Sequence, residues 1–223
     1  MLRRALADLA EINPYFVIST DLAEEADPAW RPLTALPADT AALDAAIDGT
    51  ARRLGTAERR VAASILYQGL AARLWSPVLG LLTAHGLLLD LDGVHWRPAA
   101  TGPLPLWAPK PSALPGASPE QVYDGVMTGV LVPLADAVRE AAGVARGLLW
   151  GNAASALAGT LASVVRARPE LAAPAGRLRG ELLGLGVLAG SAEIAPNGAF
   201  VRRSCCLYYR VPGGGMCGDC PLV

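Results

Sequence analysis

The chain has 223 residues, of which 52% are hydrophobic and 17% are charged, and its formal net charge is −1. This is enough material for one large domain, or two small ones, with a substantial core. A charge so close to zero gives no basic field to attract nucleic acid, so we expect no nucleic-acid partner. Aromatic residues make up only 5%, which favours a core of Ala, Leu and Val in closely packed helices.

The first half of the chain predicts helices followed by a hairpin. Apolar residues recur at helical spacing over residues 39–54 and, most strongly, over residues 57–84, where Pro77 is expected to kink or split the helix. In residues 87–96, two apolar runs flank Asp92-Gly93, a dipeptide typical of tight hairpin turns. The sequence therefore predicts a β-hairpin at this point.

A proline-rich stretch divides the predicted elements into two groups. Residues 98–117 contain six prolines and predict an extended linker or a long surface loop. We therefore expect a helical N-terminal subdomain with a β-hairpin over residues 1–97. A helical C-terminal subdomain, ending in a cysteine-containing segment, is expected over residues 118–223.

The second half predicts three more helices and a second hairpin. The helices are expected at 119–142, 144–167 and 169–185. Pro196-Asn197-Gly198 predicts a turn between strands at 191–194 and 199–203. The fold class that follows is α+β and predominantly helical: a helical core with two short β-hairpins and a C-terminal cysteine loop.

Two segments bear on location. Residues 1–12 include acidic side chains where an export signal needs an unbroken apolar run, so we expect a short helix and a cytoplasmic protein. Residues 147–165 are uncharged and long enough to span a bilayer, but they are rich in small residues and contain Asn152. A buried core helix is the preferred interpretation, with peripheral membrane association as the alternative. Asn152, if buried, needs a hydrogen-bond partner, and we hypothesise that it ties this helix to the cysteine segment.

All four cysteines lie in the last nineteen residues, at Cys205, Cys206, Cys217 and Cys220. Such a cluster is typical of a metal site, and thiolates can hold either zinc or an iron–sulfur cluster. Cys217 and Cys220 have the spacing of half a structural zinc site. Cys205 and Cys206 do not, because adjacent side chains on a strand point to opposite faces. The backbone must leave strand geometry there for both sulfurs to face one centre, and a two-iron cluster accommodates this more easily than one zinc ion.

The pattern Cys-Cys, ten residues, Cys, two residues, Cys resembles the C-terminal motif of the FhuF-type ferric siderophore reductases. The flanking residues 203–210 and 217–222 resemble the same motif, and residues 149–157 resemble the family's central helix. The resemblance implies a 2Fe–2S cluster held by Cys205, Cys206, Cys217 and Cys220. It also implies an oxidoreductase that reduces Fe(III) in a ferric siderophore and releases Fe(II) for iron assimilation.

This chemistry is consistent with the residues. One added electron weakens the hold of hard oxygen donors on the iron, so a one-electron carrier is sufficient and no acid–base catalyst is required. No phosphate-binding loop is apparent, so we expect electrons from a separate donor, a ferredoxin-like protein or a thiol. Arg202, Arg203 and Arg210 bracket the cysteines, where they would stabilise a reduced cluster or receive an anionic chelate; solvated strand residues are the alternative.

Other interpretations remain open at this point. One alternative is a protein that binds a siderophore without turnover. The other is a structural zinc protein or an iron–sulfur redox sensor. Gly213-Gly214-Gly215 is expected to let the backbone curl around the cluster. Trp75, Trp96, Trp107 and Trp150 are candidates for an apolar siderophore pocket, with core packing as the alternative.

Overall fold

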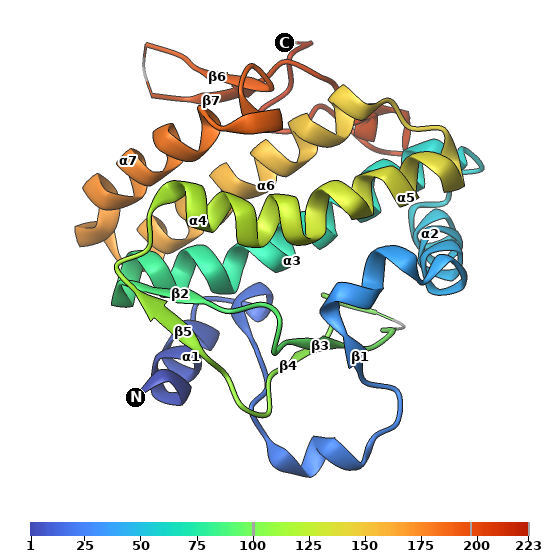
Figure 1. Cartoon of the computed structure of the whole chain (residues 1–223). Helices are drawn as coiled ribbons and strands as arrows, with labels where there is room; N and C mark the ends of the chain where they lie inside the picture. Colours follow the sequence, from blue (N-terminus) through green and yellow to red (C-terminus); the bar gives the residue numbers. More distant parts are fainter. Residues whose placement is uncertain (100, 197, 223) are drawn as a thin grey trace.

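Two long helices form the centre of the structure, a computed structural model that describes residues 1–99, 101–196 and 198–222. Helix α3 (Arg59–His85) and helix α6 (Arg146–Ala167) pack along each other over much of their length (Figure 1). Both helices bury several alanines, which keeps the two backbones close. The predicted core of small aliphatic residues in close helices is confirmed.

The other helices surround this pair. They are α1 (Leu2–Ala10), α2 (Thr40–Leu54), α4 (Pro119–Tyr123), α5 (Val132–Ala142) and α7 (Ala172–Leu183). Short 3-10 turns lie at Pro14–Phe16, Leu22–Ala26, Leu33–Ala38, Pro169–Leu171, Gly186–Leu188 and Tyr208–Arg210. Asp124–Leu131 is π-helical and joins α4 to α5, so the helix expected over 119–142 is continuous but locally wider than an α-helix.

Pro77 neither ends nor divides α3, which continues to His85. The expected split is therefore wrong. A proline removes one backbone hydrogen bond of the helix, but Pro77 lies in a fully packed stretch where its neighbours Ser76 and Val78 are buried. The helix ends instead at Gly86, whose φ of 67° is left-handed and whose N–H bonds back to the carbonyls of Leu81 and Leu82.

The first predicted hairpin is wrong in its pairing. β2 (Leu87–Leu89) pairs with β5 (Ala113–Pro115), and β3 (His95–Trp96) lies between β1 (Arg31–Pro32) and β4 (Leu106–Trp107). A turn does form at residues 90–94, but Gly93 does not adopt a positive φ. The Asp90 carboxylate accepts hydrogen bonds from the N–H of Asp92 and from the hydroxyl of Ser112, the residue before β5.

The second hairpin is confirmed. β6 (Ala192–Ile194) pairs antiparallel with β7 (Phe200–Arg202), and Gly198 in the connecting turn has a φ of 82°. Asn197, which the sequence places in this turn, lies outside the described residues. With seven helices labelled and only short strands between them, the predominantly helical α+β class is confirmed for the described part of the chain.

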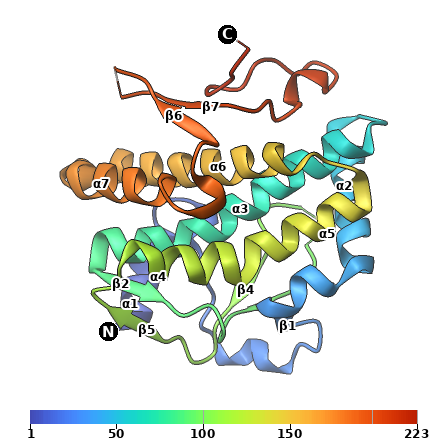
Figure 2. The ribbon, with the colours of Figure 1, turned by 45° about the horizontal axis from the view of Figure 1, so that its top comes forward.

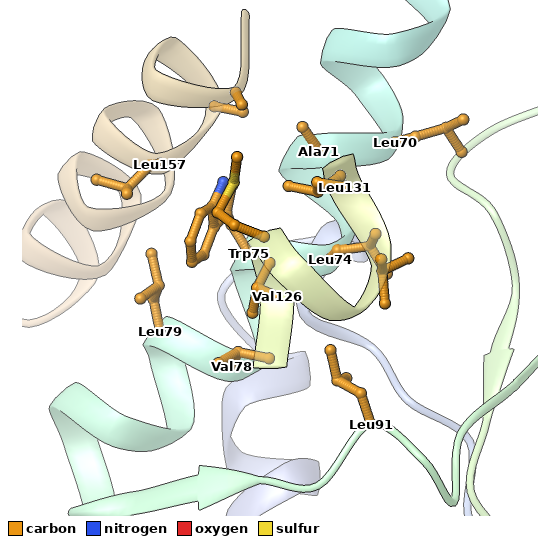
Figure 3. Close-up of a cluster of buried hydrophobic side chains, with 14 of the residues drawn as sticks. Leu70, Ala71, Leu74, Trp75, Val78, Leu79, Leu91, Val126, Leu131 and Leu157 are labelled. Carbon is orange, nitrogen blue, oxygen red and sulfur yellow. The ribbon is translucent and has the colours of Figure 1, made fainter. Parts of the chain in front are cut away.

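The proline-rich segment 98–117 contributes β4 and β5 to the small sheets, and Ala100 within it lies outside the described residues. Buried apolar side chains from before and after this segment belong to one core. Trp75 of α3 illustrates this, because it packs between Leu157 of α6 and Val126 of the π-helical segment (Figure 3). The division into subdomains at residues 98–117 stays a prediction.

Within the described part of the chain, α3 and α6 are long and apolar enough by length and composition to cross a membrane. In their most apolar windows, 67% and 61% of the residues, respectively, are buried inside the molecule. The uncharged stretch noted in the sequence is thus the middle of α6, and it packs against α3.

Candidate iron–sulfur site

The cysteine segment lies on the outer side of α6 and follows directly from β7 (Figure 2). The strand ends at Arg202, and the chain bends through the adjacent cysteines before the 3-10 turn at Tyr208–Arg210. Leu207 has a φ of 69°, a left-handed conformation that is uncommon for a residue with a side chain. Its N–H lies 3.3 Å from the sulfur of Cys205. The expected departure from strand geometry at Cys205 and Cys206 is confirmed.

Four thiols, all outside disulfides, are available as ligands. The sulfurs of Cys206 and Cys217 lie 3.7 Å apart. Two thiolates on one tetrahedral metal, each at about 2.3 Å, would be separated by roughly 3.8 Å, so this pair fits one metal centre. Among the described residues, no three His, Cys, Asp or Glu side chains are close enough together to hold a single ion. Four thiols suit either zinc or an iron–sulfur cluster, and the spacing of this pair fits two ligands of the same metal atom.

The Cys217 thiol lies in a partly desolvated environment. Burial, together with hydrogen bonds to Asp219 and Cys206, raises the pKa of the Cys217 thiol to about 12, while the charge of Arg202 opposes this rise. A coordinating metal ion would instead lower the pKa of the Cys217 thiol, because it holds a thiol in the deprotonated form. Arg202 is the positive charge that the protein itself supplies here.

The glycine run between the two cysteine pairs forms a tight turn. Gly213 has a φ of 71°, and the N–H of Gly214 donates to the carbonyl of Val211. A Cβ at Gly214 would lie 2.6 Å from the carbonyl oxygen of Tyr208. Gly214 therefore allows the chain to fold back on itself, whereas a Cβ at Gly215 would meet no atom within 4 Å. The run does form a tight turn, while its expected wrapping around the cluster stays a prediction.

Arg202 is buried, with 1% of its surface exposed, and its guanidinium donates to three polar side chains. It donates to the Asp219 carboxylate at 3.0 and 3.1 Å, to Asn152 Oδ1 at 2.7 Å and to the Ser155 hydroxyl at 2.5 Å. Its backbone N–H also reaches the carbonyl of Asp219. Burial alone would raise the pKa of Asp219, but Ser155 and Arg202 hold it below its ordinary value. A buried ion pair with this many hydrogen bonds fixes the relative position of β7 and the second cysteine pair.

Asn152 connects this ion pair to α3. Its amide nitrogen donates to the carbonyl of Ser64 at 2.9 Å and lies 3.0 Å from the Ser64 hydroxyl. The Ser64 hydroxyl donates in turn to the carbonyl of Cys206 at 2.7 Å. The hypothesis that Asn152 ties its helix to the cysteine segment is confirmed, since Asn152 contacts the segment directly through Arg202 and indirectly through Ser64.

Gly151 gives the cysteine segment room to approach α6. A Cβ at this position would lie 2.1 Å from the hydroxyl oxygen of Ser204, the residue before Cys205. The Ser204 hydroxyl donates to the carbonyl of Gly147, one turn earlier on α6. The residues Gly151, Asn152 and Ser155 of the central helix thus form the surface on which the start of the cysteine segment rests.

The other two arginines lie on the surface. Arg203 forms an ion pair with Glu193, and its side chain is 60% exposed. Arg210 donates through Nε to both carboxylate oxygens of Glu58, at 2.9 and 3.0 Å, and this bond holds the pKa of Glu58 below its ordinary value. Arg202 alone of the three arginines in the expected set is buried against the cysteine segment.

Sequence reasoning missed Ser64, Ser155 and Asp219 as supporting residues. Asp219 lies between Cys217 and Cys220, so its place near the site was visible, but its partner was not. Ser64 lies 142 residues before Cys206. Of the four tryptophans considered for a pocket, Trp75 belongs to the core, and Trp107 donates through Nε1 to the carbonyl of Asp21.

Comparison with known proteins supports the assignment of this segment. Residues 202–222 match the family model of the FhuF 2Fe-2S C-terminal domain, which includes the buried arginine and all four cysteines. A search of curated proteins found no match. The cofactor of this domain is a 2Fe–2S cluster. The C-terminal segment of the chain is therefore an FhuF-type 2Fe–2S domain.

Proposed function

We propose that the protein is a ferric siderophore reductase, in which Cys205, Cys206, Cys217 and Cys220 hold the 2Fe–2S cluster. The observation that carries this proposal is the match of residues 202–222 to the FhuF domain, on a segment that two core helices hold in place. When bound, the cluster supplies one electron at a time. Transfer of that electron converts chelated Fe(III) to Fe(II), which oxygen donors bind more weakly.

The protein's own residues position and tune the site. Cys206 and Cys217, with sulfurs 3.7 Å apart, are the pair that we assign to one iron, which leaves Cys205 and Cys220 for the other. Arg202 places a buried positive charge beside the ligands and so favours the more negative, reduced state. The N–H of Leu207 donates toward Cys205, which lowers the electron density on that sulfur.

The exposed side of the segment is the proposed approach for the chelate. Tyr208, Tyr209 and Met216 are 37%, 44% and 51% exposed, respectively. These side chains offer an apolar surface to the ligand backbone of a siderophore. We further propose that a separate donor, a ferredoxin-like protein or a thiol, supplies the electron at this same surface. A cytoplasmic location suits both the free thiols and such a donor.

The test uses protein purified without oxygen. Iron, sulfide and zinc are counted per chain, and EPR spectra are recorded before and after dithionite. The reduced protein is then mixed with a ferric hydroxamate siderophore while a ferrous chelator traps the product. Two irons and two sulfides per chain, and about one Fe(II) formed per reduced cluster, are expected. A colourless protein with one zinc per chain, or a reduced cluster that leaves the chelate unreduced, contradicts the proposal.

A further inference from the structure

A cavity of about 510 Å³ lies between α2, α3 and the residues on either side of Ala100. Its wall is mostly apolar and includes Leu43 of α2, Leu66 of α3, Trp96 of β3 and Leu104. Leu66 is two residues after Ser64, which places it about 200° around the helix from the side chain that reaches Cys206. The cavity is thus on another face of α3 from the cysteine segment.

The charge at this cavity is entirely positive. Arg52 and Arg53 line it, whereas none of the described residues around it has a carboxylate side chain. Both guanidinium groups fold back over Gly49, where a Cβ would lie 3.4 Å from Arg53 Nη1 and 3.8 Å from Arg52 Nη2. Arg53 also donates to the buried hydroxyl of Thr50 at 2.8 Å.

These two arginines have no counterion among the described residues. The nearest acidic residues on the same helix, Asp44 and Asp48, both pair with Arg59 instead. The C-terminal dipole of α2 attracts cations in its last turn, but it offers a guanidinium only partial compensation. Two adjacent guanidinium groups therefore have free donors at the edge of an apolar cavity, an arrangement suited to a carboxylate.

We propose that this cavity binds a small organic anion with an apolar body, whose carboxylate contacts Arg52 and Arg53 and whose hydrocarbon part fills the space along α3. The volume lies within the range of small-molecule pockets, about 300–1,000 Å³. This site requires neither the cluster nor electron transfer, so it goes beyond the proposed reductase function. It can be tested independently of that function.

Decanoate is the probe for this proposal, with decanol as the uncharged probe of the same length. Isothermal titration of the full cluster-loaded protein is expected to show saturable binding of one decanoate per chain and much weaker binding of decanol. The Arg52→Gln/Arg53→Gln variant is expected to bind decanoate at least about tenfold more weakly, because it removes both charged hydrogen-bond donors for the carboxylate. Arg177→Gln, an exposed arginine on α7, is the control and is expected to bind normally.

A second variant tests the cavity itself without depending on charge. A Cβ at Gly69, which lines the cavity, meets no atom within 4 Å, so Gly69→Leu places a side chain in the open space. Leucine is also the better helix former, so the fold is expected to be retained. Gly69→Leu is expected to abolish decanoate binding while leaving cluster content unchanged. Absence of decanoate binding to the parent, equal binding of decanol, or unaltered binding to Gly69→Leu overturns the proposal.

Discussion

The hydroxyl of Ser64 donates a 2.7 Å hydrogen bond to the carbonyl oxygen of Cys206, and so joins the first turns of α3 to the centre of the cysteine segment. This contact is buried, and Asn152 completes it from α6 by bonding to the same serine. Two helices distant in sequence therefore fix one cysteine of the site. The consequences can be tested residue by residue.

Ser64→Ala is expected to loosen the site. The carbonyl of Cys206 loses its donor, and an unsatisfied buried group costs about 1–3 kcal/mol. We expect faster loss of the visible chromophore in the presence of an iron chelator, together with a lower denaturation midpoint. Ser163→Ala is the control, because that hydroxyl bonds only within α6 at Gly159. Equal bleaching rates for both variants would show that the contact does not retain the cluster.

Gly151→Ala is expected to push the Ser204 hydroxyl away from α6 and break its hydrogen bond to the carbonyl of Gly147, which loosens the start of the cysteine segment. The new methyl group would lie 2.1 Å from the Ser204 hydroxyl, and overpacking of this kind costs about 1–3 kcal/mol. Gly159→Ala, in the same helix with no atom within 4 Å of the added Cβ, is expected to be neutral or stabilising. Cluster content and thermal denaturation of the two variants distinguish a steric effect from a general response of α6. The double variant Gly151→Ala/Ser204→Ala should recover part of the loss.

The glycine run offers a second matched pair. Gly214→Ala brings a Cβ to 2.6 Å from the carbonyl of Tyr208, whereas Gly215→Ala meets open space. We expect purified Gly214→Ala to hold less iron and sulfide per chain, and Gly215→Ala to match the parent. If both variants retained full iron and sulfide, the tight turn between the cysteine pairs would not be needed for assembly.

Arg202→Gln is expected to lower the midpoint potential of the cluster, because it removes a buried positive charge that favours the reduced state. The change also leaves Asp219 unpaired, and breaking a buried ion pair costs about 3–5 kcal/mol. The variant Arg202→Gln/Asp219→Asn avoids that cost and should restore stability. Its midpoint potential is expected to lie between those of the parent and of Arg202→Gln. Arg203→Gln, at an exposed neighbouring position, is the control. A redox titration followed by EPR is the measurement, and a larger shift for Arg203→Gln would contradict the assigned role of Arg202.

The ion pair between Glu58 and Arg210 gives a pH dependence. Arg210 holds the pKa of Glu58 below its ordinary value of 4.5, so this contact contributes stability above that value. The contribution is lost as the pH falls through the lowered pKa and Glu58 becomes protonated. We expect the denaturation midpoint of the parent to exceed that of Glu58→Gln at pH 7 and to approach it as the pH falls below 4.5 and through the lowered pKa of Glu58. Identical midpoints at pH 7 would show that the exposed pair adds nothing measurable.

Local sequence patterns predicted the elements that depend on local chemistry. The helical spacing gave α2, α3 and α6, and Gly198 marked the turn of the second hairpin. Asp92-Gly93 was misleading because the partner of β2 is decided by distant contacts, among them the bond between Asp90 and Ser112. The π-helical segment has no distinctive residue pattern, so a continuous helix was expected there.

The ligand residues could be predicted, but their support could not. The sequence shows four cysteines in one segment, which identified the ligands, and an amide side chain at Asn152 in an apolar helix, which predicted a structural role. Arg202 and Arg203 are adjacent and chemically alike, and only the orientation of β7 toward α6 buries one and exposes the other. Nothing in the sequence distinguishes Ser64 from other serines; only the packing of α3 brings its hydroxyl to the carbonyl of Cys206.

The continuous apolar core runs from Ala5 to Leu188 and includes none of the cysteines. The segment that carries them is attached to this core by polar side chains and by the absence of a side chain at Gly151. The helical body therefore has an apolar core that contains none of the cluster ligands. Loss of the cluster is accordingly expected to loosen the C-terminal segment while the packing of α3 against α6 is retained.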